Sequence, residues 1–202
     1  MTGPITAASA AFTDIYMQDL WGLSRMEPVE DRLTSYADII SGFIRSNRIT
    51  SVAEFGCGFW TYAALIDWRG VTYDGYDVFS GVIEKNIRDH SAPNIRFHTL
   101  TDSTRPAPVD LIICKDVFQH LPNEDVQHLL TLFKATARIS LIINDVVPDA
   151  NTNGAAERGG YRAIRLDQPP FNEACETLHE WESIDFGVDC RKRAVILRAA
   201  AP

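Results

Sequence analysis

The residues Glu54-Phe55-Gly56-Cys57-Gly58 form a loop that follows an apolar, strand-like run and precedes a helical pattern. Glycines at such a turn let the backbone approach a ligand at the carboxyl end of a strand. A dinucleotide fingerprint would have a third glycine where Thr61 stands, and the chain contains no Gly-Lys-Ser/Thr phosphate loop. The loop therefore indicates a nucleotide-like ligand, and it disfavours NAD, FAD and nucleoside triphosphates.

Acidic residues close the next two strand-like runs. Asp77 comes roughly 20 residues after the glycines, where a carboxylate can accept from both hydroxyls of a ribose. Asp102-Ser103 closes the third run, where a carboxylate can read the amine of an adenine. Both acids also suit ordinary turns at strand ends, so the ribose and adenine roles depend on the loop before them.

A third group of polar residues follows the fourth and fifth strand-like runs. His120 comes just after the fourth run, and histidine titrates near neutrality, so it is the best candidate for a general base. The alternative is that His120 packs beside the following helix. Asn144 and Asp145, after the fifth run, are further candidates for a base or an orienting group.

The elements that position these residues alternate along the chain. Amphipathic, helix-like patterns cover 31–45, 61–67, 81–89 and 124–137. Strands are expected at 51–55, 72–76, 95–100, 109–114, 139–143, 181–186 and 194–198. The alternation predicts a parallel sheet wound on both faces. A short polar turn at 189–193 makes the last two strands an antiparallel pair.

Two segments outside this pattern are expected to cover the site. Residues 1–30 contain apolar side chains at helical spacing, which predicts a helix on the sheet edge or a flap over a cofactor. Residues 146–175 have no clear period and contain Gly and Pro pairs, which predicts a lid or binding loop. Arg162 and Arg165 in that segment suggest an anionic partner, either a carboxylate or a phosphonate or phosphate, because guanidinium groups pair with such groups in a bidentate manner.

Composition limits the partners. The chain has a net charge of -8 and a pI near 5.1, so duplex DNA and long RNA are disfavoured. Its four cysteines are scattered without metal-ligand spacing, which predicts a reducing compartment and no structural metal. No signal peptide or apolar run of about 20 residues is present, so we expect a single cytoplasmic domain of 202 residues without membrane partners. A monomer and a homodimer both stay open.

Taken together, these motifs resemble class I S-adenosylmethionine (SAM)-dependent methyltransferases. More narrowly, the sequence is similar to small bacterial members with Arg-Asp-Val-Leu-x-His-Leu after strand four, an early Tyr and Trp-Gly, and a late Gly-Gly-Tyr/Trp-Arg motif that ends in Pro-Pro-Phe. The corresponding residues here are Lys115-Asp116-Val117-Phe118-Gln119-His120-Leu121, Tyr16 with Trp21-Gly22, and the stretch from Gly159-Gly160-Tyr161-Arg162 to Pro169-Pro170-Phe171. Lys115 in place of Arg and the loop ending Phe59-Trp60 depart from the pattern.

The resemblance implies a three-layer, doubly wound α/β fold, Rossmann-like, with seven mostly parallel strands and the last one antiparallel. It implies SAM as cofactor, S-adenosylhomocysteine (SAH) as product, and no metal. The implied cofactor-binding residues are Tyr16, Trp21, Glu54, Gly56, Cys57, Gly58, Asp77, Val78, Asp102, Ser103, Lys115 and Asp116. The candidate catalytic residues are His120, Asp116 and Asp145, and the candidate substrate-binding residues are Tyr161, Arg162, Arg165 and Asn144.

The expected activity is O-methylation of a small, anionic metabolite, of the kind found in secondary metabolism and antibiotic biosynthesis. A sugar or glycan methyltransferase would use the same residues, and a SAM-binding regulatory module without catalysis is a further alternative. Base methylation is disfavoured, because the Asn/Asp-Pro-Pro-Tyr/Phe signature is missing after the fourth strand. An NAD-dependent reductase is disfavoured by the missing third glycine and the missing Tyr-x-x-x-Lys pair.

Overall fold

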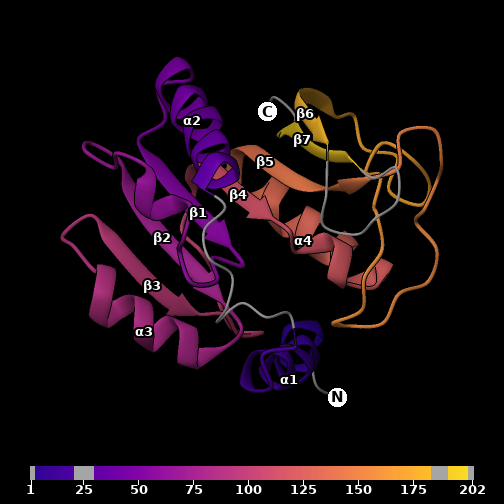
Figure 1. Cartoon of the computed structure of the whole chain (residues 1–202), viewed down its shortest axis with the longest axis horizontal. Coiled ribbons are helices and arrows are strands. Elements are labelled where there is room, and N and C mark those ends of the chain that lie inside the picture. The colour runs from indigo at the N-terminus through magenta and orange to yellow at the C-terminus, as the bar shows by residue number, and fades with distance from the viewer. Residues whose placement is uncertain (1–2, 21–29, 183–190, 200–202) are drawn as a thin grey trace. The chain divides into compact units, whose positions relative to one another are not determined.

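A computed structural model describes residues 3–20, 30–182 and 191–199 (Figure 1). The strands are β1 (Ser51–Phe55), β2 (Thr72–Asp77), β3 (Ile95–Thr99), β4 (Val109–Lys115), β5 (Ala137–Val146), β6 (Glu176–Glu182) and β7 (Arg191–Arg198). They form a mixed sheet in the order β3-β2-β1-β4-β5-β7-β6. The β7 strand runs antiparallel to both of its neighbours, and the other six strands are parallel. This arrangement confirms the predicted seven-stranded, Rossmann-like fold.

The chain divides into two compact units, residues 1–104 and 105–202, each of which is described by itself. The expectation of a single domain stays a prediction. None of the helices in the described residues is long and apolar enough to cross a membrane. Within the same residues, no three His, Cys, Asp or Glu side chains are grouped so as to hold a metal ion.

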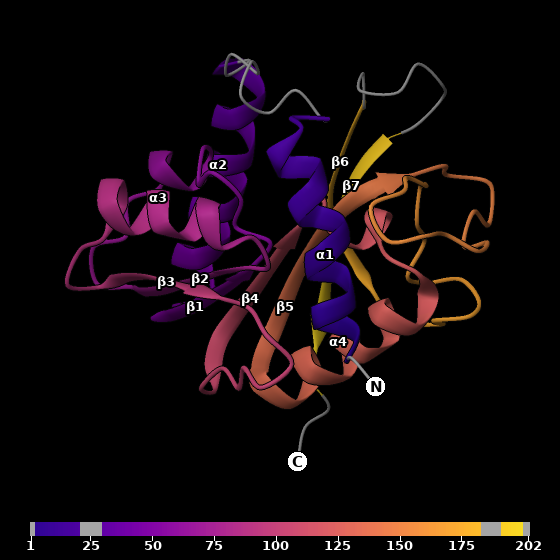
Figure 2. The same cartoon turned by 90° about the horizontal axis from the view of Figure 1, so that it is seen from below.

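Unit 1 contains the helices α1 (Pro4–Met17), α2 (Glu30–Ser46) and α3 (Ser80–His90) with the parallel strands β1, β2 and β3. Figure 2 shows α2 and α3 on one side of these strands. Four of the five β1 residues are buried, as expected for an inner parallel strand. The first four predicted strands and the predicted helices 31–45, 81–89 and 124–137 match the structure to within one residue at each end.

The helix predicted at 61–67 is wrong, because only the short 3₁₀ helix η1 (Ala63–Leu65) forms there. Trp60 has a left-handed φ of 58° just before it. The indole Nε1 of Trp68 then donates to the Ala63 carbonyl at 2.9 Å, and this carbonyl is one that a longer helix would use for its own backbone. Ile66 leaves the turn in an extended conformation.

Unit 2 contains β4, β5, β7 and β6 with the helix α4 (Asn123–Thr136) and the 3₁₀ helix η2 (Phe118–His120). The apolar β4 residues 111–114 are fully buried, and β5 is buried along nearly its whole length. Residues 147–175 contain neither helix nor strand and form the orange loops of Figure 1. This agrees with the absence of a period in the sequence.

The two last strands begin earlier in the chain than predicted, although β7 ends at Arg198 as predicted. β6 begins at Glu176 and β7 begins at Arg191, so the polar turn predicted at 189–193 is wrong for residues 191–193, and residues 183–190 lie outside the described part. Arg191 and Arg193 extend the strand because both pair with Glu180 on β6. A charged stretch that resembles a turn sequence is thus part of a strand here, because Glu180 on the neighbouring strand pairs with its arginines.

Candidate functional site

The glycine loop of unit 1 is attached to the end of β2. Gly56 and Gly58 have left-handed φ angles of 75° and 49°, which glycine adopts without steric cost. The N–H groups of Gly56 and Cys57 donate to the Tyr76 carbonyl at 2.8 and 3.1 Å. The N–H of Gly58 donates to the Asp77 carboxylate at 3.0 Å. Loop and acid therefore form one structure, while the predicted contact of Asp77 with a ribose stays a prediction.

Asp77 is a buried acid with several donors around its carboxylate. Besides Gly58, the Phe79 N–H donates to it at 3.0 Å, and the Tyr16 hydroxyl forms a further hydrogen bond. Burial raises the pKa of Asp77, although these hydrogen bonds act in the opposite direction. Burial, and then the Asp77 charge, raise the pKa of Tyr16 well above its usual value, which keeps the phenol protonated. Asp77 thus accepts a hydroxyl in addition to backbone N–H groups.

Glu54 and Cys57, both predicted in the cofactor loop, have buried side chains. The Glu54 carboxylate accepts from the Tyr62 hydroxyl and, at 2.5 Å, from the Tyr73 hydroxyl. Burial raises the pKa of the Cys57 thiol well above its usual value, so the thiol is neutral near pH 7. Asn86 of α3 donates to the Gly58 carbonyl at 2.7 Å and further fixes the loop. The predicted cofactor roles of Glu54 and Cys57 stay predictions.

The helix α1 is held by Asp102. Its carboxylate accepts from the Ile5 N–H at 2.9 Å, from the Thr6 N–H at 3.2 Å and from the Thr6 hydroxyl. The residue at the helix N-cap is Gly3, which has no capping side chain, and a Cβ atom there would overlap the Asp102 carboxylate. Asp102 therefore caps α1 from a distant part of the chain and satisfies N–H groups that would otherwise lack partners.

The other end of α1 contacts the residues around the loop. The Tyr16 ring stacks on Phe79 with centroids 4.9 Å apart and meets the edge of Phe59 at 5.9 Å. Ser9, in the middle of the helix, donates to the Val78 carbonyl at 3.1 Å. The structure thus gathers the predicted residues Tyr16, Gly58, Asp77, Val78 and Asp102 around α1, while Ser103 contacts Thr101 at 2.9 Å. Trp21 lies outside the described residues.

Unit 2 contains a cluster of two acids and two lysines, Asp116, Asp145, Lys115 and Lys192, which we call the acid–lysine cluster. Lys192 Nζ lies 2.5 Å from Asp116 Oδ1 and 3.1 Å from Asp145 Oδ1, and Lys115 pairs with the other Asp116 oxygen. Burial alone would raise the pKa of Asp116, but the two lysines outweigh it and hold this pKa well below its usual value. Asp116 is therefore ionised at neutral pH.

Lys192 is the residue of this cluster that the sequence analysis missed. It is 4% exposed, although it stands between two arginines in a stretch predicted as a polar turn. Lys192, Ala194 and Ile196 are all buried and lie two positions apart. Alternate residues of a strand share one face, so Lys192 lies on the same inward face as Ala194 and Ile196. This alternation is the sequence signal that could have identified Lys192 as buried.

His120 is held in one orientation by the loop segment. Its Nδ1 lies 2.7 Å from the Gly160 carbonyl, and because a carbonyl only accepts, we assign the proton of the neutral ring to Nδ1. Nε2 is then the acceptor nitrogen, 3.4 Å from the Gln119 amide nitrogen. Burial lowers the pKa of His120, so the ring is neutral near pH 7. A neutral imidazole can act as a general base through its acceptor nitrogen.

The predicted substrate-binding residues fall into two places in unit 2. The Tyr161 hydroxyl donates to Asp145 at 3.3 Å and so joins the acid–lysine cluster. Arg162 donates to the carbonyls of Leu121, at 2.8 Å, and Gly154, while its buried Nε has no partner among the described residues. Asn144 and Arg165 line a pocket instead, together with residues of β6 and β7.

Comparison with known proteins identifies the fold and little else. No family model and no curated protein sequence matches the chain. Among solved structures, magnesium protoporphyrin IX methyltransferase from Synechocystis PCC 6803 with bound SAH is 14% identical, with a TM-score of 0.63 over 93% of this chain and 99% of that one. Human N-acetylserotonin methyltransferase in complex with SAM is 15% identical, with a TM-score of 0.64 over 95% of this chain and 59% of that one.

A third similar structure is the N-terminal domain of EvdMO1, solved in the presence of SAH and D-fucose. It is 16% identical, with a TM-score of 0.55 over 84% of this chain and 82% of that one. At these identities the likeness establishes the arrangement of strands and helices. The chain therefore has the fold of SAM-dependent methyltransferases.

Proposed function

We propose that this chain is a SAM-dependent methyltransferase that acts on an oxygen atom of a small, anionic metabolite. The observation that carries the proposal is the buried Asp77 carboxylate at the end of β2. It accepts a hydrogen bond from the Gly58 N–H of the glycine loop and another from the Tyr16 hydroxyl. A carboxylate at this position suits the hydroxyls of a ribose. Solved structures of the same fold that contain SAM or SAH support the same cofactor.

SAM, when bound, supplies a methyl group that is already activated by its sulfonium. The protein then has to orient an acceptor, exclude water and take a proton from a hydroxyl. In unit 2, His120 has the neutral ring, with Nε2 as its acceptor nitrogen, that the last task needs. The ionised Asp116 and the Asp145 carboxylate, which accepts the Tyr161 hydroxyl, are the orienting acids of this proposal.

An anionic group on the acceptor is supported by Arg162. Two of its nitrogens donate to backbone carbonyls, and its Nε is buried without a partner in the described residues. Replacing Arg162 by Gln is expected to raise the acceptor KM far more than the KM of SAM. Equal changes in the two constants would remove the support that Arg162 gives to an anionic acceptor.

The cofactor assignment is tested by calorimetric titration of the full chain with SAM, SAH and NAD. We expect micromolar binding of SAM and SAH and none of NAD. Replacing Asp77 by Ala is expected to weaken SAM binding by about tenfold or more, because hydrogen bonds to charged groups contribute about 1.5–3 kcal/mol. The matched control is Asp74→Asn on the same strand, since Asp74 pairs with Arg96 and His98.

The two variants separate the alternatives. Asp74→Asn should keep wild-type affinity for SAM, and Asp77→Ala should bind SAM about tenfold or more weakly. Unchanged SAM affinity in Asp77→Ala, or NAD binding as tight as SAM binding, would exclude the proposed cofactor site. Release of SAH from SAM in a screen of hydroxylated carboxylic acids and phosphates then distinguishes an enzyme from a SAM-binding regulatory module.

A further inference from the structure

Unit 2 contains a pocket that the proposed methyl transfer does not use. It opens to solvent and lies between β5, β6, β7 and the segment around Arg165. The polar side chains in its wall include Asn144, Arg165, Asp167 and Arg193. Val146, Ile164, Leu166 and Val195 supply apolar wall.

The pocket lies on the other face of β5 and β7 from the acid–lysine cluster. Side chains alternate between the two faces along a strand. Asp145 and Lys192 meet on one face, so their neighbours Asn144 and Arg193 point to the opposite face. Asn144 and Arg193 are direct partners in the β5–β7 register, which places them side by side on the pocket wall. The pocket is therefore separate from the proposed catalytic residues.

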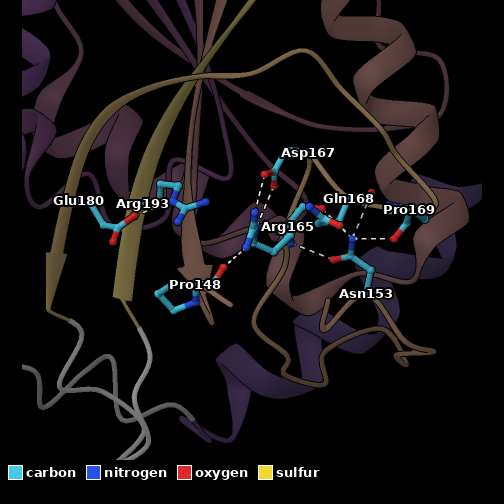
Figure 3. Close-up of polar contacts among 8 residues, drawn as sticks. All are labelled: Pro148, Asn153, Arg165, Asp167, Gln168, Pro169, Glu180 and Arg193. Carbon is cyan, nitrogen blue, oxygen red and sulfur yellow. Dashed lines mark hydrogen bonds and ion pairs between the residues drawn. The ribbon is translucent and has the colours of Figure 1, made fainter. Parts of the chain in front are cut away.

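The two arginines of the pocket differ in how many donors they have left. Arg165 gives Nε and Nη2 to Asp167 and Nη1 to the Pro148 carbonyl, so all three nitrogens are engaged. Arg193 gives only Nε, to Glu180 at 2.6 Å. Figure 3 shows the Arg193 guanidinium beside Glu180 and directed toward the Arg165 side chain. Its two terminal nitrogens have no partner within the described residues.

The wall of the pocket contains two guanidinium groups, those of Arg165 and Arg193, and one carboxylate, that of Asp167. Asp167 neutralises Arg165, with which it forms an ion pair. Glu180 is shared by two guanidinium groups, because it also accepts from Arg191 at 3.0 Å. Glu180 is thus divided between Arg191 and Arg193, whereas Arg165 is attracted by Asp149 as well as by Asp167. Arg193 is only 15% exposed, so its attraction for an anion is less weakened by water than that of a surface arginine.

Asn144 adds a second, independent requirement. Its side chain is 4% exposed and its Oδ1 is buried without a hydrogen-bond partner in the part of the chain that the structure describes. A buried acceptor without a donor is unfavourable, and such groups in native proteins call for an explanation. A ligand that brings a hydroxyl next to its anionic group satisfies both the Asn144 oxygen and the Arg193 nitrogens.

We propose that this pocket binds a small hydroxycarboxylate, with its carboxylate on the terminal nitrogens of Arg193 and its hydroxyl donating to Asn144 Oδ1. The planar guanidinium matches a carboxylate with two parallel hydrogen bonds. Cys175 in the wall does not oppose an anion, because burial raises the pKa of its thiol to about 12. This site goes beyond the proposed methyl transfer and does not depend on it.

The test uses three small probes and the full-length chain without SAM. Lactate carries both the carboxylate and the hydroxyl, propionate lacks the hydroxyl, and propane-1,2-diol lacks the carboxylate. Binding is followed through the methyl resonances of the pocket residues Val146, Ile164, Leu166 and Val195. We expect lactate to bind about fivefold more tightly than propionate, which corresponds to one added hydrogen bond, and the diol to cause no shifts.

Variants assign the two contacts. Arg193→Gln should lose the binding of lactate and propionate alike, whereas Asn144→Ala should bind both equally. The matched control is Arg191→Gln, which removes the other guanidinium on Glu180 and should retain the preference for lactate. The same spectra report whether each variant is folded, and Asn144→Ala tests the site even if Arg193→Gln is not.

Three results would overturn the site. The first is the absence of any shift of the pocket methyl groups in the wild-type chain at tens of millimolar lactate. The second is anion binding that persists in a folded Arg193→Gln variant. The third is a preference for lactate that persists in Asn144→Ala. Failure of SAM titration would leave these measurements unaffected, so the two proposals fail separately.

Discussion

The Lys192 ammonium lies 2.5 Å from the Asp116 carboxylate, although the two residues are 76 positions apart in the chain. Lys192 also lies 3.1 Å from Asp145, which is fully buried. Charges in such a place are stable only when each has its partner, because neither can return to water. The end of β4, the end of β5 and the start of β7 are therefore electrostatically dependent on one another.

Replacing Lys192 by Met is expected to lower the free energy of unfolding by about 3–5 kcal/mol, because Asp145 and Asp116 lose a shared buried partner. Denaturant unfolding measures this loss. Arg191→Met is the control, since that arginine is 53% exposed and its ion pair should contribute at most about 1 kcal/mol. Similar losses in the two variants would show that the buried lysine has no special role.

Replacing Asp102 by Ala is expected to release the start of α1. The carboxylate caps Ile5 and Thr6, and loss of a helix cap costs about 0.5–2 kcal/mol. Hydrogen exchange should accelerate at the amides of these two residues and leave α3 unchanged. Ser103→Ala is the control, because Ser103 contacts Thr101 and not the helix. Equal protection of α1 in wild type and Asp102→Ala would contradict the cap.

Stability should fall as the pH is lowered from 7 to 5. Burial holds the folded-state pKa of His120 below its value in the unfolded chain, about 6.5. In this window the unfolded chain binds more protons than the folded chain, so the free energy of unfolding rises with pH. The contribution of the neutral His120 to stability is lost as the pH falls below the unfolded pKa. Urea unfolding at pH 5, 6 and 7 should show a shallower dependence in His120→Gln than in wild type.

The matched control for this pH dependence is His128→Gln, on the exposed face of α4. It should keep the wild-type slope between pH 5 and 7. If His120→Gln also keeps that slope, the buried imidazole is not the group responsible.

The segment 147–175 is expected to open when Arg158 is replaced by Gln. Arg158 donates to both oxygens of Asp125 on α4, at 2.6 and 2.8 Å, and the Asp125 side chain is only 5% exposed. Loss of this pair should cost about 2 kcal/mol and speed limited proteolysis within the segment. Arg138→Gln provides the control, because Arg138 is 54% exposed and 3.7 Å from its partner. Proteolysis at the wild-type rate would argue against Arg158 as an anchor.

Local signals account for the parts of the fold that were predicted. The bounds of β1 were predicted to the residue, because an apolar run and a glycine loop are encoded in adjacent positions. The hydrogen bond between Gly58 and Asp77 follows from the same local pattern, since parallel strands end at one edge of the sheet. The sequence analysis placed both at the carboxyl ends of strands, and the structure adds the hydrogen bond between them.

The parts that were not predicted depend on residues far apart in the chain. Lys192 resembles a turn residue until Asp116 and Asp145 are known to be its neighbours. Likewise, the sequence around Gly3 does not indicate that a carboxylate 99 positions later caps its helix. A glycine at the N-cap shows only that the capping side chain is absent there, and not which distant residue replaces it. Pairing of charges across strands is not encoded in hydrophobic periodicity, and so it escaped the sequence analysis.

The alternation of Lys192 and Arg193 also fixes the alignment of β7. A pairing shifted by one position would turn Arg193 toward the face of Asp145 and Lys192 toward the pocket, and it would bring apolar neighbours to the wrong sides. The two cations differ in length and shape, so neither replaces the other. Inserting one residue into this strand should therefore be far more harmful than inserting two, and natural length changes near it are expected in even steps.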